Sequence, residues 1–253
     1  MSPRMKQIGF GVFTFLVYAM MIPPQPNWGA AAMLVVGVGF HELSHLWAAK
    51  KLGLKTRGFY LVPFMGGVAF IEGPYKRYSQ QAFVVLLGPV GGGLLALATA
   101  GVYYLTGVPF LAAAATWMCY LNLFNLLPLS FMDGGQLMDT IAYSFNRTFG
   151  MVLHVISTAV AAVVLWYFNP VLAIIVTLLG GGSVFMEIRH WKAFREGKTY
   201  LCSDAYLNPP TSLSRKEMAM TALGWATTIV VLSVAMLLLK QNPMSNISTI
   251  IHK

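Results

Sequence analysis

The sequence predicts an all-α polytopic membrane protein, and its composition carries most of that prediction. Hydrophobic residues make up 57% of the 253 residues, and charged residues make up only 10%. An average soluble domain has about 45–50% apolar and about 25% charged residues. The apolar residues also gather in long runs, and a membrane-spanning helix needs about 20 of them. A soluble globular enzyme and a disordered chain are therefore both excluded as classes.

The apolar runs predict about six to seven transmembrane helices, at about 8–22, 29–49, 81–105, 109–130, 150–168, 170–187 and 219–239. The first run follows Arg4 and Lys6, as a signal peptide would, but no small-residue cleavage pattern comes after it. We therefore expect a retained first span. The break at Asn169–Pro170 either separates two spans or marks a kink in re-entrant structure, which leaves the count at six to seven.

The basic residues predict the orientation of these spans. With a cytoplasmic amino terminus and seven spans, 15 of the 17 Lys and Arg residues fall on the cytoplasmic side. Such a bias sets orientation in short-looped membrane proteins. Basic residues beside spans also meet anionic lipid head groups. The net charge of +9 therefore indicates a lipid bilayer, and not nucleic acid, as the partner.

The segment between the second and third runs differs in kind from its neighbours. It is apolar but broken by Pro63, Gly66 and Gly67, and it is too short to cross a bilayer. Non-helical backbone at membrane depth must be buried in protein or line a watery cavity. We expect a short membrane-dipping β-hairpin or loop at about 57–73, entering from the cytoplasmic side.

The second run contains His41, Glu42 and His45 in the pattern His-Glu-x-x-His. On a helix, residues four apart share one face, about 5–6 Å apart at their Cβ atoms. Two imidazoles at this spacing can hold one Zn²⁺, with the glutamate between them as general base. Three ionisable groups within five residues of a span are costly unless they function or pair. The pattern predicts one zinc ion per chain.

A catalytic zinc needs a third protein ligand. His41 lies nine residues before Lys50, roughly 14 Å along the helix at about 1.5 Å per residue, which favours a ligand reaching the cytoplasmic half of the membrane. Asp133 follows the fourth run among apolar residues and is the strongest candidate. Glu72 is the alternative, although a surface ion pair suits it better. We expect Asp139 on a solvated helix face and His154 in an interhelical hydrogen bond.

These residues resemble the site-2 protease family of intramembrane zinc metalloproteases. The resemblance rests on His41-Glu42-x-x-His45 followed by Asn125-x-x-Pro128-x-x-x-x-Asp133-Gly134-Gly135. Gly66-Gly67 and Gly88-Pro89 are similar to weaker marks of the family. Ser130 and Gly91–Gly93 depart from it, where many members carry proline and asparagine. The resemblance covers about residues 29–146.

The resemblance implies a role for each matching residue. His41, His45 and Asp133 would hold the zinc, and Glu42 would activate water. Asn125, with Pro128 beside it, would contact the substrate backbone or stabilise the oxyanion. Gly66, Gly67 and Val68 would offer an edge strand to an unwound substrate. Polar residues expected to line a water path are Ser44, Asn122, Asn125 and Gln136.

The predicted function is therefore hydrolysis of a peptide bond in or near the transmembrane segment of a membrane-anchored protein. A catalytically idle relative that binds membrane segments, or a metal transporter, is the alternative. We expect a minimal form without PDZ-like or CBS-like domain, in a bacterial inner membrane. The expected organisation is a first span and external loop at 1–28, a catalytic core at 29–146, and further spans at 147–253 with a cytoplasmic loop at about 188–218.

Overall fold

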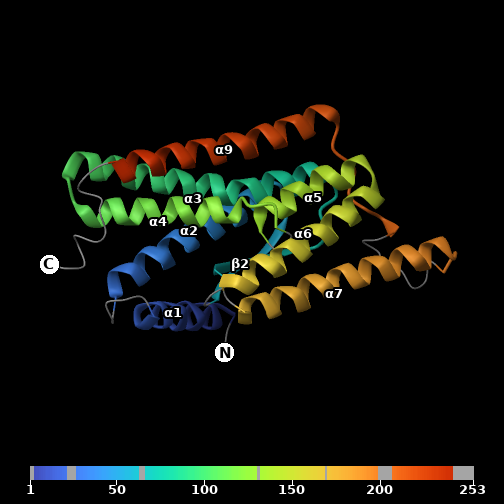
Figure 1. Ribbon diagram of the computed structural model, residues 1–253, viewed down its shortest axis with the longest axis horizontal. Helices are drawn as coiled ribbons and strands as arrows, with labels where there is room; N and C mark the ends of the chain where they lie inside the picture. The colour runs from blue at the N-terminus through green and yellow to red at the C-terminus, as the bar shows by residue number, and fades with distance from the viewer. Residues whose placement is uncertain are drawn as a thin grey trace. The chain divides into compact units, whose positions relative to one another are not determined.

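The predicted fold class is confirmed: the protein is helical, with one small antiparallel hairpin (Figure 1). The computed structural model describes residues 3–21, 27–62, 66–129, 132–168, 170–198 and 207–241. The elements, in chain order, are α1 (Pro3–Met21), α2 (Trp28–Lys51), β1 (Lys55–Val62), β2 (Gly66–Glu72), α3 (Tyr78–Thr106), α4 (Pro109–Asn125), α5 (Asp133–Phe145), α6 (Arg147–Phe168), α7 (Pro170–Arg195) and α9 (Arg215–Gln241).

Within the described residues, four helices are long and apolar enough to cross a membrane: Trp28–Lys51, Tyr78–Thr106, Arg147–Tyr167 and Arg215–Lys240. The apolar part of α1, Met5–Met20, is shorter. The protein is therefore an integral membrane protein with four candidate spans. The count of six to seven spans stays a prediction.

The break at Asn169–Pro170 separates two helices. Helix α6 ends at Phe168 and α7 begins at Pro170, where a proline fits the first turn because its missing N–H has no partner there. The two helices pack against each other (Figure 1). The break therefore separates two helices, and the choice between two spans and re-entrant structure stays a prediction.

The predicted loop at 188–218 is shorter than expected. Helix α7 continues to Arg195, and α9 begins at Arg215. The apolar run ends where charged residues begin, but Arg, Lys and Glu are good helix formers and extend the helix. Residues 199–206 of this loop, and Ser130, lie outside the described residues.

Contacts divide the chain into two compact units, and the first contains residues 1–72, 86–125 and 226–253. In this unit the buried residues Ala100 and Tyr103 of α3, Ala112 and Ala115 of α4, and Leu239 of α9 form one core cluster. The hairpin lies at 55–72, close to the predicted 57–73, and pairs Leu61 with Gly67. Helices α1 and α2 both pack against it.

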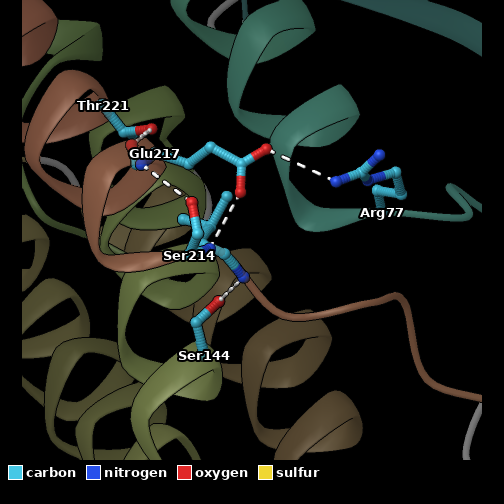
Figure 2. Close-up of polar contacts among 6 residues, drawn as sticks. Arg77, Ser144, Ser214, Glu217 and Thr221 are labelled. Atoms are coloured by element: carbon cyan, nitrogen blue, oxygen red, sulfur yellow. Dashed lines mark hydrogen bonds and ion pairs between the residues drawn. The ribbon is translucent and has the colours of Figure 1, made fainter.

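The second unit contains residues 73–85 and 126–225. Its core cluster joins Leu129 and Met132 to Ala161 and Leu165 of α6 and Ala173 of α7. Helix α9 begins with a capping box, in which Ser214 and Glu217 exchange side-chain-to-backbone hydrogen bonds of 2.8 and 3.3 Å. Figure 2 shows this pair together with Arg77, whose guanidinium lies 3.6 Å from the Glu217 carboxylate.

Candidate metal centre

Helix α2 brings the two predicted histidine ligands together. The Nε2 atoms of His41 and His45 lie 3.0 Å apart, and their rings meet edge to face. Both side chains are buried, as is that of Glu42 between them. Two nitrogen ligands of a tetrahedral zinc lie roughly 3.3 Å apart when each is about 2.0–2.1 Å from the metal. The histidine pair therefore fits one zinc ion.

The second ring nitrogen of His41 also has a partner. His41 Nδ1 lies 2.9 Å from Oδ1 of Asn122, a residue of α4 with 0% exposure. Asn122 Nδ2 in turn donates to the carbonyl of Met118 at 2.7 Å. The sequence suggested Asn122 only as lining of a water path. Because its side chain is fully buried, that suggestion is wrong.

Glycines surround these side chains closely. A Cβ atom added at Gly67 of β2 would overlap the Glu42 side chain, and one at Gly88 of α3 would overlap the His45 ring. A Cβ at Gly91 would overlap Ser44, whose hydroxyl donates to the Phe40 carbonyl at 2.8 Å. The hairpin and α3 therefore approach α2 more closely than residues other than glycine would allow at these positions.

Helix α1 occupies the outer edge of strand β1. Thr14 Oγ1 donates to the Leu61 carbonyl at 2.8 Å, and Gln7 Nε2 donates to the Arg57 carbonyl at 2.7 Å. The Leu61 carbonyl thus points away from β2. In an antiparallel pair, residues opposite each other point their polar groups the same way, either inward or outward. Gly67, opposite Leu61, therefore directs its N–H and C=O to the outer edge of β2.

Glu72 makes the surface ion pair that the sequence predicted. Its carboxylate meets the Arg57 guanidinium at the open end of the hairpin. The hydrogen bond from Arg57, and then its charge, hold the pKa of the Glu72 carboxyl below its ordinary value. A carboxylate engaged in this way at the surface is a poor candidate for a buried metal ligand.

Asp133 is the first residue of α5, in the second unit, and it is 8% exposed. It sits at the helix end whose free N–H groups favour negative charge. A Cβ at Gly134, the next residue, would overlap the backbone carbonyls of Leu126 and Leu127, so only glycine fits there. The first turn of α5 therefore packs closely against Leu126 and Leu127.

The remaining candidates lie at helix ends and on the hairpin. Asn125 is the last residue of α4 and half-buried, whereas Pro128 is exposed and its carbonyl accepts from Ser157 at 3.0 Å. Gly66 begins β2 with φ +85°, and Val68 is exposed.

The sequence also predicted the surroundings of His154 and Asp139. His154 of α6 hydrogen-bonds Asp139 of α5 at 2.9 Å, which confirms the predicted interhelical bond. The prediction of a solvated face for Asp139 is wrong, because its side chain is only 16% exposed.

Comparison with known proteins finds a match over the segment that contains the two histidines. The model of peptidase family M50 matches residues 29–118, from the start of α2 into α4. A zinc metalloprotease of Methanocaldococcus jannaschii is 31% identical over 153 residues, 58% of this chain and 41% of its own length. Rip3 of Mycobacterium tuberculosis, named as a zinc metalloprotease, is 30% identical over 214 residues, 78% of this chain and 53% of its own.

The candidate spans, the histidine pair and these relatives make the chain similar to membrane zinc metalloproteases. Over residues 29–118 it is similar to peptidase family M50, the family of the site-2 proteases. It spans about half the length of the curated relatives that it matches.

Proposed function

We propose that the chain is an intramembrane zinc endopeptidase that cuts a peptide bond in or near the transmembrane segment of a membrane-anchored protein. One observation carries this proposal. The Glu42 carboxyl lies between the two histidines in sequence and directly against Gly67 on the edge of β2. The proposed general base and the strand that carries Gly67 thus lie together beside the two histidines.

The proposed zinc ligands are His41, His45 and Asp133, a set of two imidazoles and one carboxylate that is found in catalytic zinc sites. Support for Asp133 comes from its burial, its place in the family motif and the ion pair that occupies Glu72. When bound, zinc supplies Lewis acidity that activates water and polarises the scissile carbonyl.

The proposed role of Glu42 is to move one proton. Its carboxylate takes a proton from the attacking water as the water oxygen bonds to the scissile carbon. It then gives that proton to the departing nitrogen as the C–N bond breaks. Because Glu42 is 6% exposed, bulk water does not compete for its proton. Asn125, with Pro128 nearby, is proposed to bind the substrate backbone or the developing oxyanion.

The proposed role of the hairpin is to hold the substrate in an extended form. A helix shelters its carbonyls in internal hydrogen bonds, so a transmembrane substrate must unwind before it is cut. The outward N–H and C=O of Gly67 can replace two of the lost bonds by β-augmentation. Gly66 and Val68 flank this position. Since α1 blocks the outer edge of β1, the substrate strand is expected on β2 alone.

The orientation of the site is proposed from charge. Fifteen of the 17 basic residues lie on one side of the predicted topology, which places the amino terminus and the site towards the cytoplasm. A bacterial inner membrane is the proposed location.

The decisive experiment uses Glu42→Gln and Asp133→Ala in the full chain, with a co-expressed single-span substrate. Glu42→Gln should retain zinc and abolish cleavage, because proteolysis needs the base. Asp133→Ala should lose zinc. Glu196→Gln is the matched control, since it neutralises an exposed acid paired with Lys198.

The same experiment separates the alternatives. Transport of a metal does not need Glu42 in particular, so a transporter would keep its function in Glu42→Gln. A chain that binds membrane segments without cutting them would leave the substrate intact in the wild type. Full zinc occupancy after Asp133→Ala would show that another residue is the third zinc ligand, and Glu72→Ala would then be tested.

A further inference from the structure

We propose that Asn122 is a positioning residue that holds the proton of His41 on Nδ1 and so keeps Nε2 free for the metal. This inference rests on the proposed zinc-binding function of His41. It assigns a role to a residue of α4, 81 positions away from His41 in the sequence.

The side chains of Asn122 and His41 are in direct contact. Asn122 Oδ1 lies 2.9 Å from His41 Nδ1, and neither residue is more than 3% exposed. An amide oxygen only accepts hydrogen bonds, so His41 Nδ1 must carry the hydrogen. In a neutral imidazole the other nitrogen, Nε2, then holds the lone pair that a metal requires.

A second hydrogen bond fixes the orientation of the Asn122 side-chain amide. Asn122 Nδ2 donates to the Met118 carbonyl at 2.7 Å. Exchanging the oxygen and nitrogen of this amide would set Oδ1 against the Met118 carbonyl, where two acceptors would face each other. The amide therefore stands one way only, with its oxygen towards His41.

Helix α3 packs against the Asn122 side chain. A Cβ atom at Gly92 of α3 would overlap the Asn122 amide, so the backbone of α3 directly covers this group. The amide is thus held from one side by its own helix and from another by α3. A ligand with this support keeps its ring plane as well as its tautomer.

The consequence for the metal is a preorganised ligand. A free imidazole in water favours the hydrogen on Nε2, which would block ligation through that atom. Partners of this kind behind a metal ligand typically change metal affinity or activity by about 10–100-fold when removed.

The test compares two substitutions of similar size in the purified full chain in detergent. Asn122→Leu removes the acceptor, whereas Asn122→Asp, as the neutral acid, keeps an oxygen facing His41 and an O–H facing the Met118 carbonyl. Zinc affinity is measured by competition with a chromophoric chelator. Asn122→Leu should weaken zinc binding about 10–100-fold, and Asn122→Asp should restore it to within a few-fold of the wild type. Thr116→Val is the matched control, because Thr116 is a buried α4 residue whose hydroxyl donates to the Ala112 carbonyl of its own helix.

A second measurement reads the tautomer without metal. Nitrogen NMR of ¹⁵N-histidine-labelled apo protein, with His41 assigned through His41→Gln, should show the Nδ1–H form in the wild type and in Asn122→Asp. Asn122→Leu should shift His41 towards the Nε2–H form. An unchanged His41 tautomer in Asn122→Leu, or zinc affinity equal to the wild type, would overturn the proposal.

The two proposals fail in different ways. A wild-type chain that binds no zinc would reject the proposed function, while the NMR result would still decide the role of Asn122. A wild type that binds one zinc, with no effect of Asn122→Leu, would reject only the role of Asn122.

Discussion

The backbone of Gly67 lies directly against the Glu42 side chain, so closely that a Cβ atom at this position would overlap it. A strand edge and an ionisable side chain of a helix rarely approach in this way without glycine, because every other residue places a carbon between them. The contact joins β2 to the centre of α2, so a single methyl group added at this position would displace the Glu42 side chain.

Gly67→Ala should lower peptide hydrolysis by at least about tenfold while leaving zinc bound. The added methyl group displaces the Glu42 carboxyl, and a misplacement of about 1 Å can cost about 100-fold in rate. Zinc content and the cleavage rate of a model span check this. Gly11→Ala in α1 is the control, because its Cβ would meet no atom within 4 Å. Normal cleavage by Gly67→Ala would contradict the proposed position of the base.

Gly88→Ala should instead reduce zinc affinity. A Cβ at this position overlaps the His45 ring at Nε2, the atom that would bind the metal. The chelator competition described for Asn122 measures the loss. Gly101→Ala lies on the same helix with no atom within 4 Å of its Cβ, and it should bind zinc as the wild type does. Equal affinity in both variants would show that the His45 ring can move away without cost.

The hairpin should loosen in acid. Arg57 lowers the pKa of the Glu72 carboxyl from its ordinary 4.5, so the ion pair stabilises the hairpin above that value. The contribution disappears as the pH falls through the lower pKa of the folded hairpin. Hydrogen exchange of the hairpin should therefore be faster in Glu72→Gln than in the wild type at pH 7, and this difference should disappear in acid, as the pH falls through the lowered pKa.

Its control is Glu196→Gln, which removes a similar exposed ion pair outside the hairpin. That variant should leave exchange of the hairpin unchanged at both pH values. A difference between Glu72→Gln and the wild type that persists in acid would assign the effect to side-chain shape and not to charge.

The start of α9 should depend more on its cap than on its ion pair. Ser214→Ala removes the cap that accepts from the Glu217 N–H and should cost about 1 kcal/mol of stability. Arg77→Ala removes a pair at 3.6 Å whose arginine side chain is 57% exposed, and it should cost less, about 0–1 kcal/mol. Unfolding by SDS in mixed micelles compares the two, and a larger effect of Arg77→Ala would reverse this order.

The sequence predicted the helices and the hairpin because hydrophobic runs and interrupting glycines are local features. The predicted end of α4, at about residue 130, was too late, because the apolar run continues past Asn125, where the helix ends before Pro128. The predicted end of α7, at about residue 187, was too early, because the helix continues to Arg195. The bond between Asn122 and His41 could not be predicted, because it depends on how α2 and α4 pack. The same holds for Gly92, whose contact with Asn122 exists only once α3 lies over that helix.

The attachment of α1 to β1 has a consequence for assembly. An isolated hairpin has two open edges and can join others into an unlimited sheet, which is the usual route to edge-to-edge aggregation. Thr14 and Gln7 close one of these edges. Among the described residues, strand addition at this hairpin is therefore confined to the β2 side, and growth of an extended sheet through β1 is prevented.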